Sequence, residues 1–304
     1  MFVIWNLFFC DFIFLSFSRC TTRQPRLLHL AQQIDDTVTA IRARSSVAPR
    51  VGIILGTGLG GLADQIEDKT AIPYDDLPHF PRSTAIGHRG RLILGELAGV
   101  PVAAMQGRFH LYEGYSSRQV TLPVRVFKAL GVGALFVTNA AGGLSPYHAC
   151  GDLVVLDDHI DLMAGNPLIG VNDDGLGPRF PDMSRPYDPE FIEVAERIAR
   201  REDFALHRGV YVGMTGPTYE TRAEYRFVRR IGGDVVGMST VPEAIVAVHA
   251  GMRLFGVSVV TDMCLPDALQ PAVVEKIIAI ANDAEPKLRA LICGVLAHES
   301  QCST

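Results

Sequence analysis

Short apolar runs alternate along the chain with segments of helical periodicity. The apolar runs occupy residues 51–55, 101–105, 133–137, 209–213 and 235–237, and helical patterns occupy residues 27–34 and 243–250. An uninterrupted apolar run of strand length is typical of a strand that is buried on both faces. The alternation therefore predicts an α/β protein in which helices flank a central, mostly buried β-sheet.

Polar residues follow several of these runs, and the most informative group follows residues 101–105. Arg108, His110 and Tyr112 alternate along the chain, so an extended backbone would point all three side chains to one side. Arg108 and His110 suit an anion such as phosphate, and the Tyr112 ring suits a sugar. Solvated polar residues at an ordinary strand end would show the same pattern, so this group alone does not decide between the two interpretations.

A glycine-rich segment, residues 56–61, follows the first apolar run. Its glycines allow backbone N–H groups to approach an anion, and the Thr57 hydroxyl can add a hydrogen bond. The same segment matches the dinucleotide-binding pattern G-x-G-x-x-G, with Asp75 and Asp76 near the distance expected of a ribose-binding acid. An NAD-dependent oxidoreductase is therefore an alternative, although a single match of this pattern is weak evidence.

Three further segments combine small or polar residues with apolar runs. Residues 137–143 (Val-Thr-Asn-Ala-Ala-Gly-Gly) leave room for a ligand at a strand end, although a tight turn would use the same residues. Tyr219 offers a stacking surface, and the neighbouring Glu220 can accept hydrogen bonds from an N–H edge. Met238 and Ser239 mark the passage from a strand into a helix.

The five segments together resemble the trimeric purine nucleoside phosphorylases. The resemblance covers about residues 28–298, and the five motifs occur in the family's order with similar spacing. It implies a single domain over residues 25–300, with a central mixed β-sheet flanked by helices. It also disfavours the oxidoreductase, because a dinucleotide-binding fold explains only the first glycine-rich segment.

The resemblance implies a pentosyltransferase of purine salvage. Such enzymes use inorganic phosphate as co-substrate to cleave the N-glycosidic bond of a purine (deoxy)ribonucleoside, which yields the free purine and (deoxy)ribose 1-phosphate. The transition state resembles an oxocarbenium ion, so the site must hold an anion beside the sugar and donate a proton or hydrogen bond to the leaving base. This chemistry requires neither a metal nor an organic cofactor, and the expected assembly is a homotrimer.

The family's functional residues carry over onto matching positions of this sequence. The implied phosphate-binding residues are Thr57, His88, Arg108, His110, Ala140 (through its backbone N–H) and Ser239. The implied purine- and ribose-binding residues are Tyr112, Tyr219, Glu220, Val236, Met238, Thr261, Asp262 and Val274. Phe180, in the polar loop of residues 171–188, matches an aromatic residue that a neighbouring subunit donates to the site. The implied catalytic residues are Glu220, Asp262 and His110.

Two positions depart from the pattern of enzymes that cleave 6-oxopurine nucleosides. Asp262 stands where that pattern has asparagine, and Val274 stands where it has a histidine near the ribose 5′-hydroxyl. Both residues resemble those of methylthioadenosine phosphorylases, whose aspartate serves the 6-amino group. Glu220 favours the opposite preference, because an ionised carboxylate accepts from the N1–H of guanine and hypoxanthine, which adenine lacks. We expect inosine and guanosine to be preferred, with adenosine-type or 5′-modified nucleosides as the alternative.

Composition adds limits to these expectations. The net charge of −5 gives no basic surface for nucleic acid, and 48% hydrophobic residues are ordinary for a protein that forms a core. Zinc-binding spacing is absent from the six cysteines, which are Cys10, Cys20, Cys150, Cys264, Cys293 and Cys302. We interpret them as reduced thiols of a cytoplasmic protein.

The N-terminal segment, residues 1–24, does not fit the rest of the chain. It is strongly apolar as far as Ser18, lacks a basic start and is interrupted by Asp11. Three interpretations remain open: a non-native extension from an upstream start codon, a degenerate signal peptide, or a membrane anchor. We favour the first, because the family-like region begins later, and we therefore expect neither a place in the fold nor a membrane partner for this segment.

Overall fold

The computed structural model describes residues 25–302. The expectations for residues 1–24, including Cys10 and Cys20, lie outside the described residues. Among the helices of the described part, none is long and apolar enough to cross a membrane.

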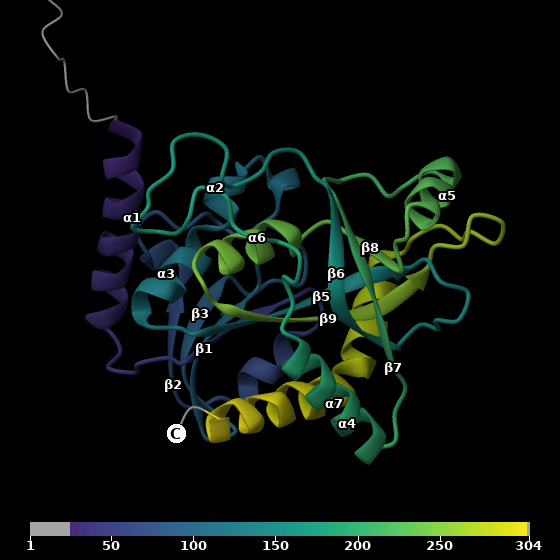
Figure 1. The fold of residues 1–304 in the computed structure, drawn as a ribbon. Helices are drawn as coiled ribbons and strands as arrows, with labels where there is room; N and C mark the ends of the chain where they lie inside the picture. Colours follow the sequence, from purple (N-terminus) through teal and green to yellow (C-terminus); the bar gives the residue numbers. More distant parts are fainter. Residues whose placement is uncertain (1–24, 303–304) are drawn as a thin grey trace, which may run out of the picture.

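Within residues 25–302, nine strands form one mixed sheet at the centre of the fold (Figure 1). Their order is β2-β3-β4-β1-β5-β8-β7-β6-β9. The bounds are β1 Val51–Leu55, β2 Glu67–Pro73, β3 Arg91–Leu97, β4 Val100–Gln106, β5 Ala134–Gly143, β6 Leu153–Leu162, β7 Leu206–Met214, β8 Val235–Gly237 and β9 Arg253–Met263. The predicted mixed, mostly buried sheet is confirmed.

Strand β9 closes part of this sheet on itself. It pairs antiparallel with β6 and parallel with β5, so β5, β8, β7, β6 and β9 form a closed ring. Strand β1 continues the sheet outward from β5 and is parallel to both β5 and β4. The carboxyl ends of β1 and β5 therefore meet at the same edge as the end of β9, which is where polar residues replace apolar ones.

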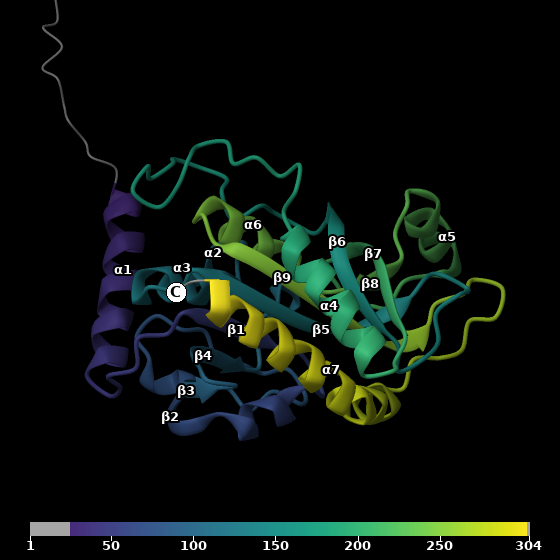
Figure 2. The same ribbon diagram turned by 60° about the horizontal axis from the view of Figure 1, so that its bottom comes forward.

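Helices cover both sides of the sheet. Their bounds are α1 Pro25–Arg42, α2 Ser117–Val120, α3 Leu122–Leu130, α4 Pro189–Arg201, α5 Arg222–Arg230, α6 Val241–His249 and α7 Val274–Cys302. Helices α6 and α7 lie on opposite sides of β5 and β9 (Figure 2). Helix α1 packs against α3 at one edge of the molecule (Figure 1).

The sequence explains why these segments adopt these structures. All five residues of β1 are buried, and each fully buried large apolar side chain stabilises the fold by roughly 1.5–3 kcal/mol. Gly52 interrupts this apolar strand because a Cβ there would lie 2.5 Å from the Phe127 ring of α3. Asp188 is the N-cap of helix α4, and its side chain accepts hydrogen bonds from the backbone N–H groups of Glu190 and Phe191.

One local prediction is wrong. Strand β4 ends at Gln106, and the chain does not stay extended to Tyr112. Gly107 turns the chain with a positive φ of 112°, and a Cβ at that position would lie 2.8 Å from the His88 side chain. The alternative interpretation of residues 137–143 as a tight turn is also contradicted, because pairing with β9 keeps β5 extended as far as Gly143.

Candidate active site

One cavity of about 460 Å³ opens where the ends of β1, β5, β8 and β9 meet. Residues from all five motif segments line it. The predicted site residues that it brings together are Thr57, Arg108, His110, Tyr112, Ala140, Tyr219, Glu220, Val236, Met238, Ser239, Thr261, Asp262 and Val274. The turn at Gly107 thus delivers the three alternating residues to the cavity, although the predicted reason, an extended strand, is wrong.

Arg108 dominates one end of the cavity, which we call the phosphate end. Its guanidinium is only 2% exposed and is held on two sides. Nε donates to Glu243 Oε1 at 3.0 Å, and Nη1 donates to the carbonyl oxygen of Thr138 at 2.8 Å and to Ser239 Oγ at 3.1 Å. Nη2 is buried without a hydrogen-bond partner among the described residues. Because buried donors are nearly always satisfied, this N–H indicates a place for an anion.

Ser239 reaches Arg108 from a tight turn at the start of α6. Thr240 has φ 71° and ψ −51°, and the N–H of Val241 donates to the carbonyl oxygen of Ser239 at 2.8 Å. This γ-turn is strained for a residue with a branched side chain. Tyr211 and Asn139 hold it in place, because Tyr211 Oη accepts from the Ser239 N–H and Thr240 Oγ1 accepts from Asn139 Nδ2. The strain is therefore retained at the phosphate end.

His110 is oriented by Glu113. Oε1 of Glu113 lies 3.1 Å from His110 Nδ1 and accepts from the His110 backbone N–H at 2.8 Å. Although burial opposes ionisation, hydrogen bonds from His110 and Thr84 lower the pKa of Glu113 to about 2. The ionised carboxylate keeps a proton on Nδ1 and leaves Nε2 of His110 for the cavity.

His88 stands behind the phosphate end and does not line the cavity. Its Nε2 lies 3.2 Å from Thr57 Oγ1, and its ring stacks on His110 at a centroid distance of 5.3 Å. Burial, together with the nearby charges of His110 and Arg108, lowers the pKa of His88 to about 4. The neutral imidazole orients the Thr57 hydroxyl, so His88 is placed to act on an anion through Thr57.

Two carboxylates mark the opposite end of the cavity, which we call the base end. Asp262 Oδ1 accepts from Thr261 Oγ1 at 3.0 Å, and Oδ2 accepts from Cys264 Sγ at 3.2 Å. Burial raises the pKa of Glu220, and the negative charge of Asp262 adds to this shift. Tyr219, which is 46% exposed, forms part of the rim.

Besides His88, Phe180 is the predicted site residue that does not line the cavity. Its side chain is 85% exposed, and the Arg179 guanidinium carbon lies 5.4 Å from its ring centroid. Val171 of the same loop and Ile169, which precedes it, are also exposed. Within one chain, Phe180 does not contribute to the site.

Several residues that shape the site were not predicted. Glu113, Glu243, Tyr225 and Cys264 contact predicted residues or line the cavity. The sequence held a signal for Glu113, because this acid follows His110 by three residues, which is the spacing of a capping box. Glu243 also carried one, because an acidic residue within an otherwise apolar helix is expected to have a buried partner.

The dinucleotide-binding interpretation of residues 56–61 is contradicted. The segment leads into a 3₁₀ helix, Gly60–Gln65, and then into β2, so the α-helix that a pyrophosphate requires does not follow. Asp75 pairs with Arg82 and Asp76 pairs with Arg44, and neither acid lines the cavity. Within residues 25–302, no group of three His, Cys, Asp or Glu side chains is arranged to hold a metal ion.

Comparisons with known proteins agree with this geometry. The family model of the phosphorylase superfamily matches residues 50–297. The chain is 48% identical over 269 residues to purine nucleoside phosphorylase 1 of Bacillus subtilis, which covers 88% of this chain and 99% of that protein. Two solved structures of Schistosoma mansoni purine nucleoside phosphorylase, in complex with adenosine and with inosine, each superpose with a TM-score of 0.82 at 41% identity, covering 88% of this chain and 96% of theirs. The chain belongs to the phosphorylase superfamily.

Proposed function

We propose that the protein is a purine nucleoside phosphorylase that transfers the (deoxy)ribose of a purine nucleoside to inorganic phosphate. The observation that carries this proposal is the unpartnered Nη2 of the buried Arg108 at one end of a cavity whose other end holds Glu220 and Asp262. An anion and a purine can thus occupy one cavity with the sugar between them. The similarity to purine nucleoside phosphorylases over nearly the whole of their length supports the same assignment.

The phosphate end binds inorganic phosphate, which is the nucleophile of the reaction. Arg108, Ser239 and Thr57 offer side-chain donors, and Ala140 offers its backbone N–H. His110, whose Nδ1 lies against Glu113, lines the same region. A phosphate fixed here places negative charge next to the sugar as the glycosidic bond lengthens and the sugar becomes cationic. Glu243 pairs with Arg108 from behind and keeps the guanidinium in this orientation.

The base end receives the charge that develops on the leaving purine. Glu220 accepts from the N1–H of a 6-oxopurine when it is ionised, and Asp262 donates to N7 when it is protonated. A 6-aminopurine requires the reverse, with a donor at N1 and an acceptor at the amino group. We propose that inosine and guanosine are preferred and that adenosine is also accepted, which the complexes of the Schistosoma mansoni relative with both nucleosides support.

The sugar lies against apolar and aromatic side chains. Tyr112 and Met238 line the middle of the cavity, and Val274 and Ile277 of α7 line one side of it. Val274 and Ile277 offer no hydrogen bond to a 5′-hydroxyl, so a methylthio group at that position is tolerated. We propose that 5′-methylthioadenosine is a secondary substrate for this reason.

A homotrimer in the cytoplasm completes the proposal. Phe180 and Val171 are exposed on the loop of residues 171–188 and Ile169 is exposed just before it, and exposed apolar side chains of this kind suit a subunit interface. We propose that Phe180 covers the sugar of a neighbouring subunit. The free thiols of Cys150, Cys264 and Cys293 suit a reducing compartment.

A substrate survey tests the proposal. Inosine, guanosine, adenosine and 5′-methylthioadenosine are each incubated with the purified protein, with and without phosphate, and release of the free base is measured. We expect phosphate-dependent release that is fastest for inosine and guanosine. Binding of a nicotinamide dinucleotide without any base release, or base release that ignores phosphate, would overturn it.

A further inference from the structure

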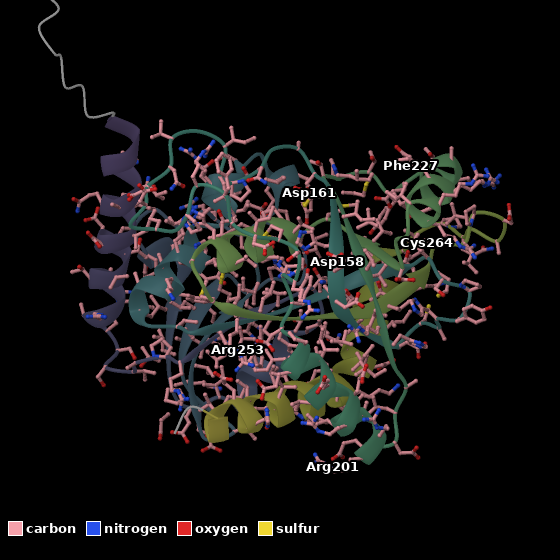
Figure 3. All side chains as sticks on the ribbon, viewed as in Figure 1. Asp158, Asp161, Arg201, Phe227, Arg253 and Cys264 are labelled. Atoms are coloured by element: carbon pink, nitrogen blue, oxygen red, sulfur yellow. The ribbon has the colours of Figure 1, made fainter. Side chains whose placement is uncertain are left out.

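Two side chains that the proposed reaction does not use connect the two carboxylates of the base end. Tyr225 lies on α5 and Cys264 lies just after β9, and both line the cavity between Glu220 and Asp262. Figure 3 shows Cys264 close to α5. Both side chains are almost fully buried, so their polar atoms depend on each other and on the carboxylates for hydrogen bonds.

Cys264 donates a hydrogen bond to Asp262. Its Sγ lies 3.2 Å from Asp262 Oδ2 and packs so closely against the backbone of Gly142 that a Cβ could not fit there. Burial and the negative charge of Asp262 raise the pKa of the thiol, so the sulfur keeps its proton and donates it. A donor on Oδ2, beside the Thr261 hydroxyl on Oδ1, stabilises the ionised form of Asp262.

Tyr225 serves Glu220. It lines the cavity together with Glu220 and lies in the same buried cluster as Cys264. Burial raises the pKa of this phenol above its usual range, so it remains a donor. The hydrogen bond from Tyr225 lowers the pKa of Glu220 against the rise that burial causes. Each of the two side chains has one proton to donate, so Tyr225 stabilises the charge on Glu220 and Cys264 stabilises the charge on Asp262.

The two classes of purine need the same number of protons in different places. A 6-oxopurine presents N1–H as a donor and N7 and O6 as acceptors, so it fits an ionised Glu220 and a protonated Asp262. A 6-aminopurine presents N1 as an acceptor and its amino group as a donor, so it fits a protonated Glu220 and an ionised Asp262. One proton on the pair suffices for either base.

We propose that Tyr225 and Cys264 are positioning residues that divide one proton between Glu220 and Asp262, and that they thereby set the ratio of 6-oxopurine to 6-aminopurine turnover. The inference rests on the proposed function, because it takes Glu220 and Asp262 as the groups that read the base. Cys264 favours the 6-amino state by stabilising ionised Asp262, and Tyr225 favours the 6-oxo state by stabilising ionised Glu220.

Other titratable groups lie near Glu220 and Asp262, but they do not determine which of these two carboxylates carries the proton. Tyr219 stands at the rim, and Glu224 and Cys150 approach from α5 and from the loop after β5. The pKa values of Tyr219 and Cys150 are raised, chiefly by burial, and both groups stay neutral near pH 7. Glu224 is ionised in the variants as well as in the wild-type protein, so its effect cancels in a comparison between them.

Two variants with opposite expected effects test the inference. Cys264→Ala removes the donor to Asp262 and should lower kcat/KM for adenosine relative to inosine by about three- to tenfold, the net value of one hydrogen bond. Tyr225→Phe removes the donor to Glu220 at nearly constant volume and should shift the same ratio by a similar factor toward adenosine. The dissociation constants of hypoxanthine and adenine should move in the same directions.

Three further variants sharpen the test. Cys264→Ser keeps a donor and should retain the wild-type ratio within about twofold. The double variant Cys264→Ala/Tyr225→Phe lacks both donors and should return toward the wild-type ratio at a lower absolute efficiency. Cys150→Ala, which changes an exposed thiol outside the cavity, is the matched control and should alter neither substrate.

The outcomes separate this inference from the proposed function. Shifts of opposite sign support the division of the proton. Equal losses on both nucleosides, or shifts of the same sign, would overturn it, because a merely loosened pocket predicts that result. If neither variant changes the ratio while Asp262→Asn does, Asp262 still reads the base and only the inference fails. If the wild-type protein cleaves no nucleoside with phosphate, both the inference and the proposed function are overturned.

Discussion

The two ends of the cavity are built in different ways. At the phosphate end, Arg108 is locked by Glu243, the Thr138 carbonyl and Ser239, and the strained Thr240 is held by its neighbours. At the base end, the side chains come from the end of β9 and from the segment that precedes α5, and their hydrogen bonds are made through a thiol and two hydroxyls.

This difference matches what each end has to recognise. Every substrate brings the same phosphate, so its donors can be fixed by buried ion pairs and strand backbones. The purine varies, and the groups that contact it can exchange a proton or be replaced without disturbing the sheet. We therefore expect substitutions at the phosphate end to abolish turnover and those at the base end to redirect it.

Replacement of Arg108 should have the largest effect. Hydrogen bonds to charged groups are worth about 1.5–3 kcal/mol, so Arg108→Ala should lower phosphate-dependent kcat/KM by tenfold to more than a hundredfold while purine binding changes little. Initial rates over a range of phosphate concentrations measure the loss. An unchanged phosphate dependence would place the anion elsewhere.

A second variant separates this effect from a loss of stability. Arg108→Ala leaves Glu243 buried and unpaired, which is expected to destabilise the fold by about 3–5 kcal/mol. Adding Glu243→Gln removes that charge and should recover much of the thermal stability. Phosphate use should not recover, since the cation is still missing.

Asp262→Asn should redirect turnover and leave the reaction intact. An amide can donate to N7 and to a 6-oxo group, so inosine and guanosine cleavage should be kept or improved. Activity on adenosine and 5′-methylthioadenosine should fall by about tenfold, because a neutral amide oxygen accepts from the 6-amino group more weakly than an ionised carboxylate does. Measuring all four substrates on both proteins decides the matter, and an identical profile would mean that Asp262 does not read the base.

Phe180→Ala tests whether a neighbouring subunit covers the bound nucleoside. The variant should raise the nucleoside KM by about fivefold, since the aromatic ring no longer shields the sugar. The oligomer should remain largely intact by light scattering. Tyr147→Ala removes a similarly exposed aromatic ring outside the cavity and is the control. A monomer with full activity would contradict the proposal that Phe180 of one subunit covers the sugar bound by its neighbour.

Glu113→Gln should change the stability of the fold, and its effect depends on pH. The pKa of Glu113 is lowered from 4.5 to about 2, so its ionised form stabilises the folded state above about pH 4.5, and this stabilisation is lost as the pH falls toward 2. The difference in unfolding free energy between wild type and variant should thus be larger at pH 7 than at pH 3. Denaturant titrations at the two pH values measure it, and equal differences would argue against an ionised Glu113.

The sequence predicted the residues of the cavity better than the path that the chain takes to reach them. Arg108, His110 and Tyr112 do converge, but the chain turns at Gly107, where the His88 side chain leaves no room for a Cβ. That contact joins two distant segments, so no local pattern could reveal it. Tyr225 and Cys264 were missed for a similar reason, because their role depends on the approach of α5 to the end of β9 and is absent from either segment alone.

The most direct test of the proposed reaction follows the fate of the phosphate. Inosine and inorganic phosphate are incubated with the protein and the mixture is followed by ³¹P NMR, with hypoxanthine measured in parallel. The account predicts that a ribose 1-phosphate signal grows in equal amount to the hypoxanthine released, and that Arg108→Ala suppresses both. Hypoxanthine released with free ribose, while the phosphate signal stays constant, would contradict it.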